Sequence, residues 1–121
     1  MSLSVSTQVS PVGSKLIVET DAGVTPDTNV TGAAGTLYII DVDNTGNPAD
    51  QACLKLYDNA APTVGSTAPE MVVRVKANQR RGVVIPEGWD FAALSFACVT
   101  SPGTAGVVAP ANPVIVRIVA S

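Results

Sequence analysis

Two aspartates and a threonine at alternate positions form the part of the sequence best suited to bind a cation. Asp41, Asp43 and Thr45 precede Gly46, and this spacing matches the first half of a calcium-binding loop, in which alternate side chains direct oxygens at one ion. Such a loop ends in a bidentate acid at its twelfth position, where this chain has Ala52. The three residues are therefore weak metal candidates, and we expect neither a metal nor another cofactor.

A solvated turn is the favoured interpretation of the same segment. Asn44, Gly46 and Asn47 belong to residue types that tolerate the positive φ angles of tight turns. Asp41 and Asp43 could also be regarded as a glycosidase pair, since two residues on one strand face lie about 7 Å apart. The chain has one Trp and only 4% aromatic residues, so nothing else in it indicates a sugar cleft.

The residue types that most enzymes need are missing from this sequence. The chain contains no histidine, which removes the commonest general base and all Ser–His and Cys–His nucleophile pairs. It also lacks a glycine-rich phosphate loop of either standard spacing. Its two cysteines, Cys53 and Cys98, are expected to be buried thiols rather than a disulfide. We expect no catalytic residues, and a protein that is not an enzyme.

The candidate interface residues are three cations and a tryptophan. Lys76, Arg80 and Arg81 fall within six residues of one another, in what we interpret as a small basic hairpin tip. An ordinary polar turn is the favoured interpretation, and docking on an acidic rim of a partner is the alternative. Trp89 is an interface anchor if it is exposed, and a packing residue at the edge of the core if it is not.

The elements that must position these residues are strands. The 19 glycines and prolines interrupt the chain too often for helices of ordinary length, and between them apolar residues alternate with period two. Eight strands are predicted, at Ser2–Val9, Lys15–Thr20, Thr36–Asp43, Gln51–Tyr57, Met71–Ala77, Arg81–Ile85, Ala92–Thr100 and Val114–Val119. The fourth and seventh, rich in Ala and Leu, would also tolerate a helix.

Eight short strands predict an all-β, single-domain β-sandwich, either immunoglobulin-like or jelly-roll. We expect residues 1–35 to supply N-terminal strands or an arm with a Gly/Thr/Pro-rich loop, and residues 36–121 to form the body of the sandwich. Charged residues are 14% of the chain, against about 25% in a typical globular protein. Part of the surface is therefore expected to be covered by partners.

Charge and hydropathy exclude two classes of partner. The net charge is −3, with seven Lys and Arg spread among ten acids, so nucleic-acid binding is not expected. The chain lacks a run of 18 apolar residues and a basic, apolar leader, so we expect neither a membrane span nor a secretion signal.

Four segments of the sequence resemble small virion structural proteins of tailed bacteriophages, in particular those that decorate or cement the capsid. The resemblance is carried by Leu54–Pro69, Val84–Gly88, Leu94–Ala97 and Pro113–Ile118, and extends from about Leu37 to the end of the chain. It is a pattern of strands and loops rather than a catalytic fingerprint.

The resemblance implies a β-sandwich bound to the outside of an icosahedral shell, where it stabilises contacts between capsid subunits. Its partners would be the major capsid protein or other virion proteins, with self-association, and its location the virion, assembled in the host bacterial cytoplasm. A tail, neck or fibre component is the alternative within the structural class. A carbohydrate-binding or adhesin module is the alternative outside it, with Tyr38, Tyr57 and Trp89 as its only platforms.

Overall fold

The computed structural model describes residues 2–7 and 13–121, and this part of the chain is all-β, with eight strands and no helix. Each predicted strand is present, with small shifts at most ends; Val9, at the end of the first predicted strand, lies outside the described residues. The strands are β1 (Leu3–Thr7), β2 (Lys15–Ala22), β3 (Gly35–Asp43), β4 (Ala52–Asp58), β5 (Met71–Val75), β6 (Arg80–Phe91), β7 (Leu94–Val99) and β8 (Val114–Ala120).

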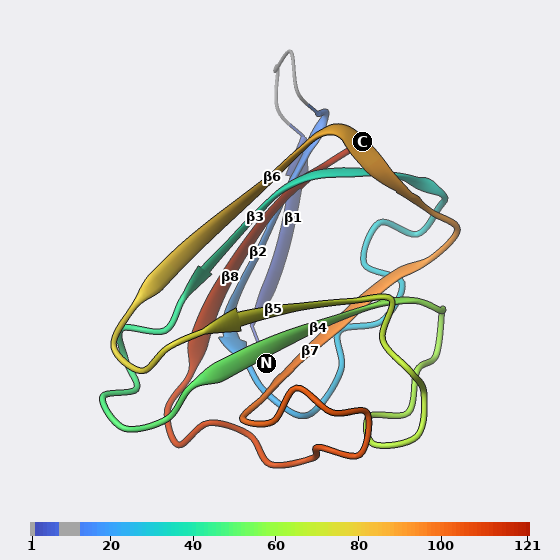
Figure 1. Ribbon diagram of the computed structural model, residues 1–121. Coiled ribbons are helices and arrows are strands. Elements are labelled where there is room, and N and C mark those ends of the chain that lie inside the picture. Colours follow the sequence, from blue (N-terminus) through green and yellow to red (C-terminus); the bar gives the residue numbers. More distant parts are fainter. Residues whose placement is uncertain (1, 8–12) are drawn as a thin grey trace.

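The strands form two antiparallel sheets that face each other across one core (Figure 1). The larger sheet has five strands in the order β1-β2-β8-β3-β6, and the smaller has three in the order β5-β4-β7. Strands β1 and β2, which belong to the predicted N-terminal part, lie in the larger sheet through the pairing of β2 with β8. Among the described residues, no helix is long and apolar enough to cross a membrane.

The order of pairing identifies the topology. The first half of the chain pairs with the second half in reverse: β2 with β8, β3 with β6, and β4 with β5. Between β2 and β3, the irregular segment 23–30 bonds to the free edge of β7 through an isolated bridge between Asp27 and Phe96. One long antiparallel ribbon is thus wound around the core. Of the two sandwich types that the sequence allows, immunoglobulin-like and jelly-roll, this is the jelly-roll arrangement.

Period-two alternation decides which residues form the core. In β8, Val114, Val116 and Ile118 are fully buried between the sheets, while the residues between them are half-buried on the outside. The same rule places Ile40 and Val42 of β3 inside. Because strand side chains point alternately to the two faces, the sequence pattern of these strands is enough to predict their buried face.

Strand β4 departs from that rule, since both of its faces are buried. Leu54 and Leu56 belong to the core, but Lys55 and Tyr57, which alternate with them along the strand, are also buried. The loop between β7 and β8 (residues 100–113, the covering loop) lies over Lys55 on this outer face, because Lys55 Nζ donates to the loop carbonyls of Gly103 and Gly106. Burial on both faces removes the alternation, which is why a helix was also compatible with the sequence here.

Strand β6 is longer than predicted and contains a large bulge. The sequence predicted a strand that ends at Ile85, before Pro86, but β6 continues to Phe91. Four residues of β6, Ile85 to Gly88, stand opposite the single residue Tyr38 of β3. A bulge is where an edge strand can accommodate a proline, and Gly88 takes the positive φ angle of 80° that the bulge requires.

The two cysteines are buried free thiols on neighbouring strands. Cys98 of β7 pairs in register with Leu54, and Cys53 of β4 pairs with Val99. Adjacent residues of a strand point to opposite faces, so one thiol faces the core and the other the covering loop. Burial raises the pKa of both thiols, that of Cys98 to about 12.

Candidate functional site

The basic segment is not the tip of a regular hairpin, as the sequence predicted, but a connection between the two sheets. It joins β5, which pairs with β4, to β6, which pairs with β3. The two strands therefore diverge from the turn at Ala77–Gln79, as Figure 1 shows. Asn78 has a positive φ angle of 56°, in agreement with the tight turn predicted near it.

Two buried asparagines fix the position of this turn. Asn44 Nδ2 donates to the carbonyls of Asp50 and Lys76 at 2.9 and 3.1 Å. Asn47 Nδ2 donates to Asn44 Oδ1 at 2.9 Å, and the carbonyl of Asn47 accepts from the amide of Asn78. Buried amides that are fully paired make a rigid joint, so the two loops move as one unit.

The predicted turn within Asp41–Asp50 is present, with Thr45, Gly46, Pro48 and Ala49 exposed, but the reason given for its asparagines and glycine was wrong. Asn44 and Asn47 are 0% and 1% exposed, and neither they nor Gly46 are among the described residues with positive φ angles. The two asparagines instead hold neighbouring loops in place through the hydrogen bonds of their side chains. Sequence alone did not indicate this, because two of the partners, Lys76 and Asn112, lie far away along the chain.

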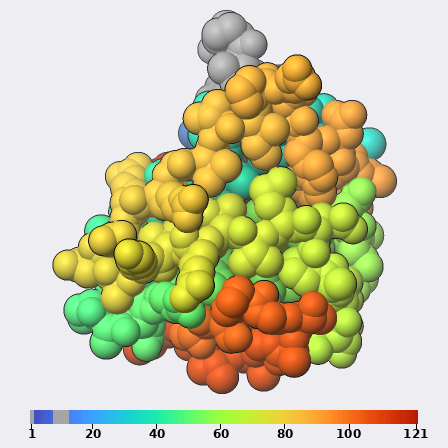
Figure 2. Space-filling model, viewed as in Figure 1, coloured from blue at the N-terminus to red at the C-terminus, as the bar shows by residue number. Residues whose placement is uncertain are grey.

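A cleft lies between the diverging strands β5 and β6, on the face of the molecule that Figure 2 shows. It consists of two adjoining hollows of about 520 Å³ and about 270 Å³, and Arg74 and Arg81 line both. The hollow near the turn is lined by Arg74, Val75, Lys76, Gln79, Arg80 and Arg81. The second hollow is lined by Met71, Val72, Val73, Arg74, Arg81 and Val83. The cleft thus has a basic end at the turn and an apolar end where the strands are further apart.

The basic end concentrates positive charge in a chain whose net charge is −3. Four of the seven Lys and Arg residues line the hollow at the turn. Among residues 2–7 and 13–121, Arg80 is the only one of these four that forms an ion pair. Arg74 Nε donates to the amide oxygen of Gln51 at 2.9 Å, and Arg81 Nη1 donates to the carbonyl of Arg74 at 3.1 Å. These neutral partners leave the charges uncompensated, which suits binding of anionic groups.

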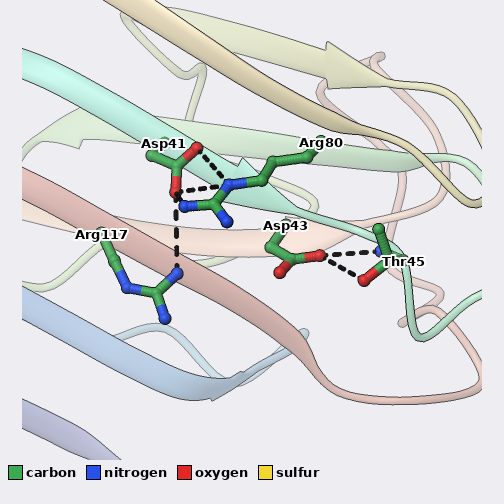
Figure 3. A network of polar contacts seen from close by, with 5 residues as sticks. All are labelled: Asp41, Asp43, Thr45, Arg80 and Arg117. Carbon is green, nitrogen blue, oxygen red and sulfur yellow. Dashed lines mark hydrogen bonds and ion pairs between the residues drawn. The ribbon is translucent and has the colours of Figure 1, made fainter.

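The weak metal candidates are engaged in other contacts and do not converge on one point (Figure 3). Asp41 Oδ2 accepts from Arg80 Nη2 at 2.7 Å and lies 3.6 Å from Arg117 Nη1. Asp43 Oδ1 accepts from the hydroxyl and the amide of Thr45 at 2.6 and 3.0 Å. These two hydrogen bonds lower the pKa of Asp43. Within the described part of the chain, no group of three His, Cys, Asp or Glu residues is placed to hold a metal ion.

The aromatic residues are mostly engaged in packing. Trp89 is partly buried against the core, with its ring centroid 6.1 Å from that of Phe91. Tyr57 is 1% exposed. Tyr38 is half-buried, with its ring beside Gly88 of the bulge. Carbohydrate recognition by stacking needs an exposed ring face, which neither Tyr57 nor the packed Trp89 offers.

The structure brings together three of the four predicted interface residues, Lys76, Arg80 and Arg81, and leaves Trp89 outside the cleft. Sequence reasoning missed Arg74 and the apolar lining. The signal for Arg74 was its central, outward position in a strand that leads into the basic turn. The apolar lining of the cleft could not be predicted from the sequence, because it exists only when β5 and β6 belong to different sheets.

Comparison of the chain with protein-family models, with curated proteins and with solved structures gave no match.

Proposed function

We propose that this chain is a structural protein of a tailed-bacteriophage particle, which binds the outside of the capsid and stabilises contacts between capsid subunits. The observation that carries the proposal is the cleft between β5 and β6, with its uncompensated cations and adjoining apolar lining. A surface of this kind is suited to bind another protein, because charge complementarity selects the partner and apolar burial contributes to affinity.

Two further features support the capsid as the partner. The resemblance to phage decoration and cement proteins includes Leu54–Pro69, which forms most of β4 and the loop that leads to β5. The jelly-roll arrangement is common in viral capsid domains, although a fold by itself supports many functions. Exposed valines on the surface, Val84, Val107 and Val108, are 66%, 51% and 64% exposed and offer additional contact area.

The copy number of the chain in purified particles tests this proposal. A copy number that scales with the number of capsid subunits supports a decoration role, and particles stripped of the chain should rupture at a lower temperature. A handful of copies per particle would instead assign the chain to the neck, tail or fibre. Absence from purified particles would overturn the virion assignment altogether.

The role of the cleft on the particle can be measured separately. Stripped particles are incubated with the purified wild-type chain or with the Lys76→Gln/Arg81→Gln variant, and bound chain is quantified after sedimentation. We expect the variant to lose binding while Lys15→Gln, a charge change on β2 at the other side of the large sheet, retains it.

A further inference from the structure

We propose that the cleft between β5 and β6 binds an extended segment of a partner protein whose first residues are acidic and whose following residues are apolar. The segment would lie antiparallel to β5, as an added strand of the smaller sheet. This inference rests on the proposed function, because it specifies the chemistry of the partner that the cleft recognises.

The charge of the cleft sets the composition of one end of the segment. Arg74, Lys76 and Arg81 surround the same hollow and have no ion-pair partner among the described residues. Carboxylates are the groups that pair with Arg in a planar, two-bonded geometry and with Lys as a point charge. Side chains alternate along a strand, so acidic residues at alternate positions would present carboxylates to this end together.

The apolar lining sets the composition of the other end. Met71, Val72 and Val83 line the second hollow, and Val72 is 36% exposed. An apolar side chain in this hollow would remove both its own surface and that of the lining residues from water, at roughly 25 cal/mol per Å². The two hollows share Arg74 and Arg81, so one continuous segment can occupy both.

The free edge of β5 supplies the main-chain contacts. Strand β5 pairs only with β4, at the edge of the smaller sheet. The carbonyl of Arg74 accepts its hydrogen bond from Arg81 across the cleft, which shows that this edge faces the cleft. An added strand would take over that carbonyl and release the Arg81 guanidinium for a carboxylate. Strand addition of this kind derives affinity from main-chain bonds and specificity from alternate side chains.

The neighbouring edge is less suited to strand addition. Strand β6 bulges between Ile85 and Gly88 and contains Pro86, and bulges and prolines protect edge strands from pairing.

The direction of the bound segment follows from that of β5. The carboxyl end of β5 lies at the basic turn, so a segment that runs antiparallel to β5 has its first residues at the basic turn. The acidic residues must therefore precede the apolar residues.

A polypeptide fits the cleft better than a nucleic acid does. Lys76 and Arg80 line only the hollow at the turn, and apart from Arg74 and Arg81 the second hollow is lined by apolar side chains. A single strand of nucleic acid needs positive charge along its whole path. The lining contains no aromatic side chain on which a base could stack.

The test is fluorescence polarisation of a labelled synthetic peptide, Glu-Val-Glu-Val-Thr-Val, titrated with the purified chain. Two peptides serve as controls: the reversed sequence Val-Thr-Val-Glu-Val-Glu, which has the same composition, and a peptide with lysines in place of the glutamates. We expect the first peptide to bind about tenfold more tightly than its reversed form, and the lysine peptide not to bind.

Matched variants locate the site. Lys76→Gln is expected to weaken binding about tenfold, through the loss of one charge-assisted contact, whereas Lys15→Gln leaves it unchanged. Val72→Thr, in the apolar hollow, weakens binding, whereas Val84→Thr, at an exposed valine outside the cleft lining, does not. Threonine has nearly the shape and the β-propensity of valine, so we expect both threonine variants to fold as the wild-type chain does.

Three results would overturn the inference: equal affinity for the two glutamate peptides, equal effects of the paired variants, or tighter binding of a thymidine decamer than of the acidic peptide. The last would assign the cleft to nucleic acid. The peptide titration does not involve particles. If the peptide fails to bind while the wild-type chain still binds stripped particles, the proposed function stands and only the chemistry of the partner is wrong.

Discussion

A buried pair of carboxyl groups makes the stability of this protein depend on pH in an unusual direction. Glu19 of β2 and Asp27 of the segment that bonds to β7 are 0% and 3% exposed. Glu19 Oε1 accepts from the amides of Ser2 and Asp21 at 2.6 and 2.9 Å. Burial first, and then the hydrogen bond to Glu19 and its charge, raise the pKa of Asp27 from 3.8 to about 8.

The sign of the effect follows from the two states. Between pH 4 and 8 the folded chain keeps the proton on Asp27, while the unfolded chain loses it, so the free energy of unfolding falls as pH rises through this range. A shift of about 4 units at about 1.4 kcal/mol per unit sets an upper limit of about 6 kcal/mol. Solvent screening and relaxation around the ionised pair reduce the effect below this limit, and we expect the free energy of unfolding to fall by about 2–4 kcal/mol across this pH range.

The measurement is urea unfolding, followed by the fluorescence of Trp89, at intervals from pH 4.5 to 8.5. Asp27→Asn keeps the shape and the hydrogen bond to Glu19 but cannot ionise, so its stability should vary far less over this range. Glu87→Gln, an exposed carboxyl on β6, should keep the wild-type slope. The chain has no histidine, so few other groups titrate here. A wild-type stability that is flat or rises with pH, or an Asp27→Asn variant that keeps the slope, would refute the reasoning.

Three further predictions concern stability and reactivity. Gly88→Ala should cost about 1–3 kcal/mol in urea unfolding, because φ is 80° and the new methyl group would meet the side chains of Thr36 and Tyr38; a loss below 0.5 kcal/mol would contradict the bulge geometry. Cys98, whose pKa burial raises to about 12, should not react with a thiol reagent until the chain is unfolded; labelling of the native protein at the unfolded rate would contradict its burial. Lys55→Ala should increase the rate of proteolysis within the covering loop, because Lys55 Nζ donates to the carbonyls of Gly103 and Gly106 at 2.6 and 3.1 Å. An unchanged cleavage rate would show that these bonds do not hold the loop.

The position of each strand was predictable because local sequence encodes it. Glycine and proline mark the ends of strands, and period-two alternation marks the buried face, as in β8 with Val114, Val116 and Ile118 inside. Where a strand is buried on both faces, as around Lys55, the alternation is absent and helix and strand could not be separated.

Burial of isolated polar residues was not predictable. Lys55 is fully buried because the covering loop, about fifty residues further along the chain, supplies the carbonyls that receive its ammonium group. Asn44 and Asn47 are buried because two other loops meet them. A polar side chain is stable inside a protein only with its hydrogen-bond partners in place, and here Lys76, Gly103, Gly106 and Asn112 are partners remote in sequence.

The sequence by itself determined that this chain is all-β, which segments are strands, and that three cations lie close together around the turn between the fifth and sixth strands. Only the tertiary structure decided that those two strands belong to different sheets, that Arg74 joins the cations, and that a cleft opens between them. The physical reason is that side-chain alternation is a property of a single strand, whereas the choice of neighbour depends on packing between segments from opposite halves of the chain.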